Sequence, residues 1–351
     1  MATRRAFIAG LIATGLSPKP TWADAGSPAF LSAAKKPDGR YVLCGLRADG
    51  QIAFELVLPA RGHAATAHPI RPEAVAFARR PGTYALVLEC ADGRQKARLE
   101  APKGRHFYGH GAFSADGELL FTTENDFENA RGVVGVWDAQ HGYARLGEFG
   151  SGGVGPHDIK LMPGGETLVV ANGGIETHPE TGRTKLNLSS MRSNLSYVTL
   201  EGVIDAQMEL AASHQRNSIR HLAVAESGDV AFAMQWQGDL TDDLPLLGVH
   251  NKRNPTPRLF SDASGRTMQG YLGSIAVNNS GNHIAVTSPR SGTFQIHSIG
   301  GPSETSNLTD VCGVAAFGEG FVVTSGTGAF RTPTSGDTTH NLAWDNHLIA
   351  I

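Results

Sequence analysis

Residues 110–123 read His-Gly-Ala-Phe-Ser-Ala-Asp-Gly-Glu-Leu-Leu-Phe-Thr-Thr, which is an apolar run, a polar turn ending at Gly117 and a second run of apolar and β-branched residues. Asp-Gly between two β-rich segments is typical of a hairpin, because glycine accepts the positive φ that a tight turn requires. The stretch therefore predicts two short antiparallel strands joined at Gly117.

The same pattern recurs along the chain. Clear copies occupy 158–171, 221–234 and 274–287, and weaker copies occupy 32–44, 74–88 and 312–325. Seven copies predict an all-β fold with a single seven-bladed β-propeller, since a β-sandwich would not repeat one hairpin seven times. Residues 340–351 predict a last strand that either completes the final blade or pairs with the first, which closes the ring and removes its exposed edges.

The first residues predict an export signal. Arg4 and Arg5 precede a short apolar run, and small residues at Thr21 and Ala23 indicate cleavage after Ala23. The Thr-Arg-Arg-x-Phe-Ile form resembles the twin-arginine signature, so we expect residues 1–23 to be the signal, residues 24–351 the propeller, and the periplasm the destination. The alternative is a basic terminus that contains two arginines by chance.

The composition limits the classes of partner. The chain has 30 basic and 33 acidic residues, and removing residues 1–23 takes away three basic and no acidic ones, so the net charge changes from −3 to −6. A mildly acidic domain lacks the positive footprint of a nucleic-acid-binding protein. No further apolar stretch approaches the roughly 20 residues that span a bilayer, so we expect no membrane insertion of the mature chain.

The three cysteines, Cys44, Cys90 and Cys312, are too few for a disulfide framework. An oxidising compartment permits a Cys44–Cys90 bridge, but buried thiols are the expectation that we favour.

Polar residues gather where the propeller pattern predicts one mouth of the central channel. His110, His157 and His221 stand near the starts of first strands in neighbouring blades, where they could converge on one ion. Imidazole nitrogens suit zinc, copper or iron, and a nearby carboxylate would complete the site. The alternative is that these histidines cap strands. The full set of candidate metal residues is His106, His110, His157, His221, Asp158, Glu124 and His178.

A second set of residues at the predicted mouth suggests an anionic ligand. Arg71, Arg220 and Arg290 could bind a carboxylate or phosphate through paired hydrogen bonds, and Trp236 could stack on the ligand. The alternatives are salt bridges between blades for the arginines and ordinary packing for the tryptophan. The long segment 172–188 interrupts the repeat on the same face, and such loops commonly carry binding residues.

The string Val-Ala-Asn-Gly-Gly-Ile-Glu-Thr-His-Pro at 170–179, with Lys-Leu-Asn-Leu at 185–188, resembles a signature of a bacterial family of unknown function. Gly-Pro-His-Asp at 155–158 and Ser-Ile-Arg-His at 218–221 extend the resemblance over the mature chain. Members of that family are twin-arginine-exported WD-type propellers, often encoded beside imelysin-like iron-uptake proteins and di-haem oxidoreductases. The resemblance implies a periplasmic setting and an association with iron acquisition, and it supplies no catalytic residues.

Three functions follow as hypotheses. The first is a binding protein for iron or another transition metal, with the histidines at the channel mouth as its site. The second is a scaffold that docks an imelysin-like or haem-containing partner. The third is a propeller enzyme, such as a lactonase or a quinone-linked dehydrogenase, although the sequence contains no nucleophile elbow, CxxCH haem site or phosphate loop.

Overall fold

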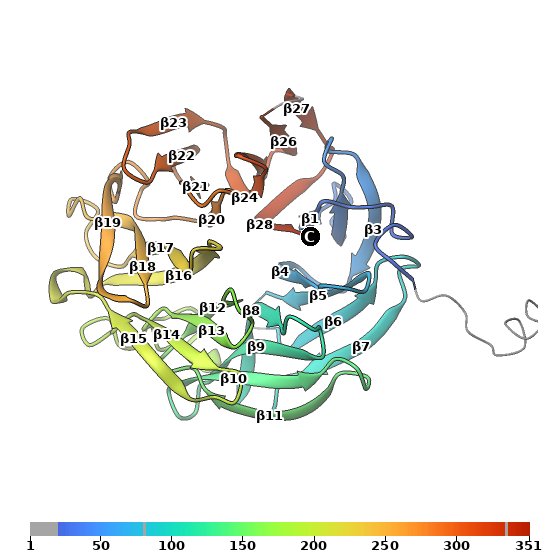
Figure 1. The fold of residues 1–351 in the computed structure, drawn as a ribbon, viewed down its shortest axis with the longest axis horizontal. Coiled ribbons are helices and arrows are strands. Elements are labelled where there is room, and N and C mark those ends of the chain that lie inside the picture. The colour runs from blue at the N-terminus through green and yellow to red at the C-terminus, as the bar shows by residue number, and fades with distance from the viewer. Residues whose placement is uncertain (1–19, 80–81, 334–335) are drawn as a thin grey trace, which may run out of the picture.

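Seven four-stranded antiparallel sheets stand around a central axis and form a closed seven-bladed propeller (Figure 1). The computed structural model describes residues 20–79, 82–333 and 336–351. Arg4, Arg5 and most of the predicted export signal lie outside the described residues. The predicted fold class and blade number are confirmed.

The first three blades are made from the two ends of the chain and the residues up to 150. From the axis outward, the first blade contains β28 (Ala343–Ala350), β1 (Phe30–Lys35), β2 (Tyr41–Leu46) and β3 (Ile52–Leu58). The second contains β4 (Gly62–Ala67), β5 (Glu73–Ala78), β6 (Tyr84–Glu89) and β7 (Gln95–Glu100). The third contains β8 (Arg105–Phe113), β9 (Leu119–Asp126), β10 (Arg131–Asp138) and β11 (Ala144–Gly150).

The remaining four blades follow in chain order. The fourth blade contains β12 (Pro156–Leu161), β13 (Thr167–Asn172), β14 (Asn194–Thr199) and β15 (Ile204–Glu209), and the fifth contains β16 (Asn217–Val224), β17 (Asp229–Trp236), β18 (Pro245–Asn251) and β19 (Asn254–Ser264). The sixth blade contains β20 (Ser274–Val277), β21 (His283–Ser288), β22 (Thr293–Ser298) and β23 (Ser303–Asn307). The seventh contains β24 (Val311–Phe317), β25 (Gly320–Ser325), β26 (Ala329–Thr332) and β27 (Gly336–Thr339). Two single-turn 3₁₀ helices, η1 (Pro179–Thr181) and η2 (Ala212–His214), lie in connections.

The hydrophobic core lies between neighbouring blades rather than inside one compartment. Each apolar cluster joins two adjacent sheets: for example, Leu31 and Leu43 of the first blade pack with Leu86 and Leu88 of the second. The second strand of a blade is therefore covered on both faces, which explains why sequences such as Leu-Val-Val-Ala at 168–171 are apolar without alternation. Every blade depends on both of its neighbours for burial.

The two ends of the chain meet in the first blade. β28 is its innermost strand and pairs antiparallel with β1, with Phe30 opposite Ala350 and Lys35 opposite Ala343. This confirms that the last strand closes the ring by pairing with the first blade. Trp344 anchors the closure, because its buried ring packs with Phe30 and Phe330, and its indole N–H donates to the carbonyl of Gly328 at 3.3 Å.

The hairpin pattern has different positions in different blades. The copy around Gly117 is the first-to-second-strand hairpin, but the weaker copies at 32–44 and 74–88 join the second and third strands. In the first two blades the innermost strands are β28 and β4, and neither belongs to a copy of the repeat. The three cysteines are buried free thiols, as favoured from the sequence. Neither described helix is long and apolar enough to cross a bilayer.

We predict that Trp344→Ala lowers the unfolding free energy by about 3–5 kcal/mol, because a fully packed tryptophan at the ring closure is replaced by a cavity. Urea denaturation followed by tryptophan fluorescence and circular dichroism measures the change. Val57→Ala on the same blade, where Val57 is 62% exposed, is the control and should change stability by less than about 0.5 kcal/mol. Equal effects of the two substitutions would contradict the closure's role.

Candidate metal centre

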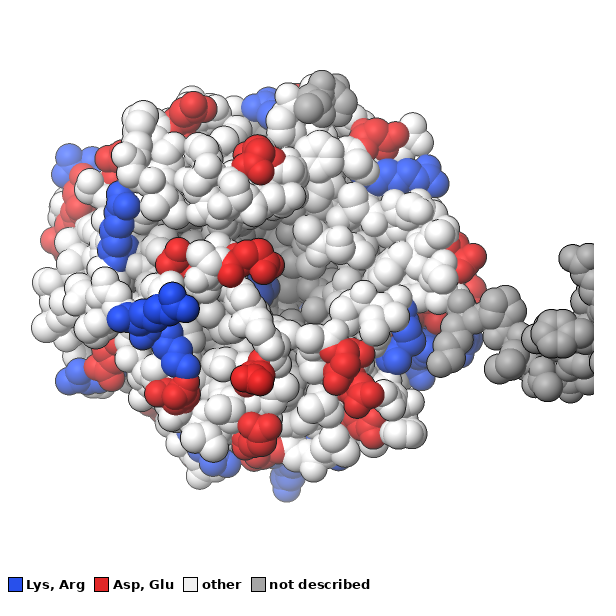
Figure 2. Space-filling view, viewed as in Figure 1, with Lys and Arg blue, Asp and Glu red and all other residues white. Residues whose placement is uncertain are grey.

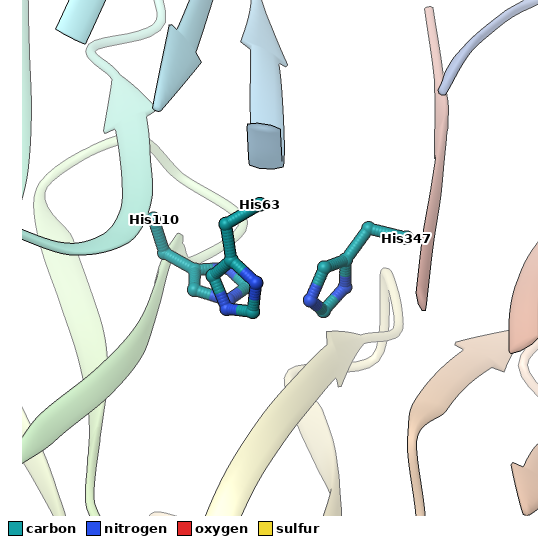
Figure 3. A group of neighbouring side chains, drawn as sticks. All are labelled: His63, His110 and His347. Atoms are coloured by element: carbon teal, nitrogen blue, oxygen red, sulfur yellow. The ribbon is translucent and has the colours of Figure 1, made fainter. Parts of the chain in front are cut away.

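Five imidazoles meet at the centre of the channel, each from a different innermost strand. They are His63 on β4, His110 on β8, His157 on β12, His221 on β16 and His347 on β28. Their neighbouring ring centroids are separated by 4.7–6.0 Å. Figure 3 shows three of these rings directed toward one another from three strands. We call these five residues the histidine cluster.

Local irregularities of the innermost strands aim the side chains into the channel. The pairing register shifts between Gly62 and Ala65 around His63, between Phe107 and Gly111 around His110, and between Pro156 and Asp158 around His157. The strands that carry His221 and His347 have similar shifts beside these residues. A β-bulge breaks the alternation of side chains and turns one of them away from the pleat. The cluster thus depends on the same irregularity in five separate strands.

His110 is the hub of the cluster, with its ring centroid 4.7–6.0 Å from those of the other four histidines. Its Nδ1 lies 3.2 Å from Asp158 Oδ1. A carboxylate in this position favours a proton on Nδ1 and leaves Nε2 as the nitrogen with a free lone pair. His110 is therefore oriented as a histidine ligand held by a carboxylate usually is.

Asp158 is fixed by more than His110. Its oxygens accept hydrogen bonds from the backbone N–H groups of Ile159 at 2.8 Å and Leu222 at 2.9 Å, and Lys160 Nζ lies 3.3 Å away. Burial opposes ionisation, but the positive charge of Lys160 and the contact with His110 outweigh it, so the pKa of Asp158 lies below its ordinary range. The carboxylate is ionised and links the blades that carry His157 and His221.

Each histidine of the cluster has one buried ring nitrogen without a hydrogen-bond partner among the described residues. These atoms are Nδ1 of His63, His157 and His221 and Nε2 of His110 and His347. A buried polar atom without a partner costs about 1–3 kcal/mol, and most such groups in proteins are satisfied. Five orphaned nitrogens in one place mark the channel axis as the candidate binding site.

Four histidines of the cluster are held in their neutral form. Burial, reinforced by neighbouring histidines and by Arg79 or Arg220, lowers the pKa of His63 and His157 well below 6.5. Burial likewise lowers the pKa of His347 and brings that of His221 to about 3. Neutral imidazole is the form that coordinates metal ions, because the protonated ring has no free lone pair.

The nitrogens form two overlapping trios that fit a metal ion. His63, His110 and His347 form one, and His110, His157 and His221 form the other, with the ligand atoms of each trio within 4.8 Å of one another. Two nitrogens bound tetrahedrally to one zinc ion are about 3.4 Å apart when each bond is about 2.1 Å long. Binding of an ion would therefore require the nitrogens of each trio to move closer together than the 4.8 Å limit within which they lie.

Close backbone approach makes room for the cluster. The ring of His63 lies against Gly109, where a Cβ atom would come within 2.3 Å of that ring. Gly109 also has a φ of +101°, which disfavours any residue with a side chain. Gly109 therefore leaves room for the ring of His63, and the next residue, His110, is itself a member of the cluster.

The cluster divides the channel into two chambers. One, which we call the vestibule, has a volume of about 320 Å³ and includes His63, His157 and His221 in its wall. The other, which we call the apolar funnel, has a volume of about 770 Å³, and among its described lining residues Lys160 is the only charged side chain. Figure 2 looks along the ring axis and shows a central hollow whose wall is mostly uncharged.

The structure brings His110, His157, His221 and Asp158 together, but it does not bring the other three metal candidates to them. His106 bonds to the carbonyl of Phe107 and to Asn125. Glu124 is buried inside its blade and accepts two hydrogen bonds from Arg145, at 2.7 and 3.0 Å. His178 caps η1 and packs against Phe127.

The candidate anion-binding residues are also divided. Arg220, Trp236 and Arg290 line the vestibule. Arg71 does not, because it follows β4 rather than preceding it and binds Glu73 at 2.6 Å beside Lys96. Its side chain lines a separate pocket between the second and third blades, and the nearby ring of His68 bonds to the carbonyl of Gly117 in a hairpin turn. The prediction for Arg71 was wrong because the repeat at 74–88 forms the second and third strands of its blade, not the first and second.

The segment 172–188 reaches the vestibule with Arg183 and Lys185. The two ends of this segment have a structural role. The Asn172 amide donates to Ser151 O at 2.9 Å and to Asn194 Oδ1 at 2.8 Å, and the Asn187 amide donates to Gly174 O at 2.9 Å. The motif therefore anchors the segment over the mouth.

Sequence reasoning missed His63 and His347. Both lie on innermost strands outside the repeated hairpins, so the pattern gave them no place at the axis. No local signal separates them from other histidines, because His283 and His297 also lie on strands and are followed within two positions by isoleucine without joining the cluster.

A family model described as a protein of unknown function, DUF1513, matches residues 56–351. Among curated proteins, no sequence matches the chain. A solved structure titled Kuenenia stuttgartiensis hydrazine synthase is similar with a TM-score of 0.61 and 10% sequence identity, covering 92% of this chain and 96% of that one. At this identity, and with 916 similar solved chains, the likeness shows the propeller fold alone.

The neutral histidines of the cluster predict that the metal-free protein loses stability in mild acid. Below the ordinary histidine pKa of 6.5, the unfolded chain binds protons that these folded histidines exclude. The unfolding free energy therefore decreases as the pH is lowered, down to the folded-state pKa, which is about 3 for His221. The slope is up to about 1.4 kcal/mol per pH unit for each such histidine.

Urea denaturation between about pH 7.5 and pH 5 measures this slope. His347→Gln keeps a neutral polar side chain but removes one titrating group, so its slope should be smaller than that of the wild type. Identical slopes for the two proteins would contradict the burial of His347 in its neutral form.

Proposed function

The chain belongs to the DUF1513 family, and because that family has no established function, we propose from the channel itself that the protein binds one transition-metal ion in the histidine cluster. The observation that carries the proposal is the convergence of five imidazoles, each with one buried ring nitrogen that has no partner among the described residues. A metal ion bound by one trio accepts lone pairs from three of these nitrogens at once.

The chemistry of the ligands selects the class of ion. An all-imidazole set suits zinc, copper or iron and is a poor match for calcium or magnesium, which take oxygen ligands. Asp158 holds the Nδ1 side of His110 and supplies a negative charge near the ion without being displaced from its backbone hydrogen bonds.

His110 also sets the stoichiometry. It is shared by both trios, and its Nδ1 faces Asp158, so only Nε2 is available for coordination. One lone pair cannot serve two ions at the same time. The two trios are therefore alternative or combined ligands of a single ion, and the protein binds one equivalent.

The setting belongs to the proposal as well. Arg4, Arg5 and the apolar run after them support export by the twin-arginine route to the periplasm, and the resemblance of residues 170–179 supports an association with iron acquisition. Twin-arginine export carries folded proteins, which suits a ring whose last strand must pair with the first. An imelysin-like or haem-containing partner is the corresponding proposal for an interacting protein.

We expect the purified protein, stripped of metal by chelator and dialysed, to bind one equivalent of Zn²⁺ or Cu²⁺ in isothermal titration calorimetry. His110→Ala should weaken this binding by at least about 100-fold, because it removes the ligand shared by both trios, and Asp158→Asn by about 10- to 100-fold. His141→Ala, which changes a histidine exposed at the surface, is the matched control and should bind as the wild type does.

Circular dichroism and urea denaturation of each variant separate lost binding from lost folding. If folded His110→Ala still binds one equivalent with the affinity of the wild type, the ion lies elsewhere and the proposal is wrong. If the wild type shows no saturable binding of zinc, copper or iron, the proposal also fails.

A further inference from the structure

The vestibule is lined by positively charged side chains, although the chain as a whole is acidic. The protein is acidic, with a net charge of −3, yet five cationic side chains line this one cavity and, among its described lining residues, none is an Asp or Glu. They come from four blades and are Arg79, Arg183, Lys185, Arg220 and Arg290. Concentrating like charges in a partly enclosed cavity is unfavourable unless an anion neutralises them.

Two of these side chains, Lys185 and Arg290, contact neutral groups that do not compensate their charge. Lys185 donates to the amide oxygen of Gln237, and Arg290 lies over the ring of Tyr271 with its Cζ 4.5 Å from the centroid. Both partners are neutral. Arg290 also donates from Nη1 to the carbonyl of Gln269 at 3.4 Å, which uses one of the five N–H donors of a guanidinium group.

Arg79 is only partly neutralised. Its Nη1 lies 3.6 Å from Asp345, too far for a hydrogen bond, while Arg61 holds the same carboxylate at 2.6 Å. Burial and the charge of Arg61 lower the pKa of Arg79, and burial with the charges of Arg220 and Arg290 lowers that of Lys185. The cations therefore repel one another across the cavity.

We propose that the vestibule is a binding site for a small polycarboxylate anion. Its volume of about 320 Å³ lies at the lower end of the range of ligand sites and suits a molecule of about a dozen non-hydrogen atoms. The cations are distributed around the mouth from four blades, so several separated carboxylates match them better than one point charge does. Guanidinium groups bind carboxylates through paired hydrogen bonds.

The aromatic residues of the cavity complete the site. Trp236 forms part of the wall and is held in place, because its indole N–H donates to the carbonyl of Asp239 at 2.7 Å. Tyr271 supports Arg290 from the other side. These rings cover the carbon skeleton of a ligand whose carboxylates face the cations.

This proposal stands without the metal proposal, because every cation that carries it lies outside the histidine cluster. The two sites are nevertheless adjacent, since His63, His157 and His221 also line the vestibule. If an ion occupies the cluster, an anion in the vestibule lies beside it, and each should strengthen the binding of the other.

Citrate is the probe, titrated calorimetrically into metal-free protein, with acetate and inorganic phosphate as comparison ligands. We expect saturable one-to-one binding of citrate that weakens as the NaCl concentration rises from about 50 to 500 mM, because salt screens the charges. Acetate and phosphate should bind at least about tenfold more weakly, since neither spans the separated cations.

Arg290→Gln and Lys185→Gln change exposed side chains, so neither should unfold the protein. Each should weaken citrate binding by at least about tenfold through the loss of a charged hydrogen bond. Arg94→Gln is the matched control and should leave binding unchanged. It removes an exposed arginine that pairs with Asp92 in the turn between β6 and β7 and does not line the vestibule.

Failure of citrate to bind the metal-free wild type would overturn the proposal, as would unchanged binding by both Arg290→Gln and Lys185→Gln. Binding of phosphate as tight as that of citrate would overturn the assignment to a polycarboxylate. Zinc titration of the same preparation is a separate measurement, so the vestibule and the metal centre can fail independently.

Discussion

The pairing of β28 with β1 is the interaction on which the rest of the molecule depends. It joins residues separated by nearly the whole chain and gives the first blade its innermost strand. Because each apolar cluster lies between two blades, closing the ring lets every blade bury both faces. The same pairing carries His347 to the axis, where it meets His63 and His110, so fold closure and assembly of the candidate site are one event.

The channel combines features that are each costly alone. Histidines with orphaned nitrogens lie at its centre, and cations line the vestibule beside them. A metal ion would satisfy the first, and an anion would neutralise the second. A cation and an anion side by side also compensate each other's charge in a partly enclosed cavity, where such interactions are stronger than in water. The metal ion proposed for the histidine cluster and the anion proposed for the vestibule would therefore stabilise each other, although each can be tested separately.

The sequence predicted the fold better than the site. The Gly-containing hairpins report local turn chemistry, so seven repeats were enough for seven blades. Which strand of a blade lies innermost depends on how the ring closes, and that is a long-range property. In the first two blades the repeat marked the second and third strands, so Arg71 was expected at the wrong mouth and His63 and His347 were missed. His110, His157 and His221, in blades where the repeat begins with the innermost strand, lie together as expected.

The bulges explain the remaining differences. His106 and His110 lie on the same strand, yet only His110 turns into the channel, because the register shifts between Phe107 and Gly111. Spacing alone does not reveal such a shift.

Anomalous diffraction from a crystal grown with one equivalent of Zn²⁺ or Cu²⁺, with data collected at the absorption edge of the metal, tests the central claim most directly. We expect a single strong peak on the channel axis, about 2.1 Å from Nε2 of His110 and within bonding distance of at least two more cluster histidines. Metal peaks confined to surface residues such as His141, with none in the channel, would contradict it.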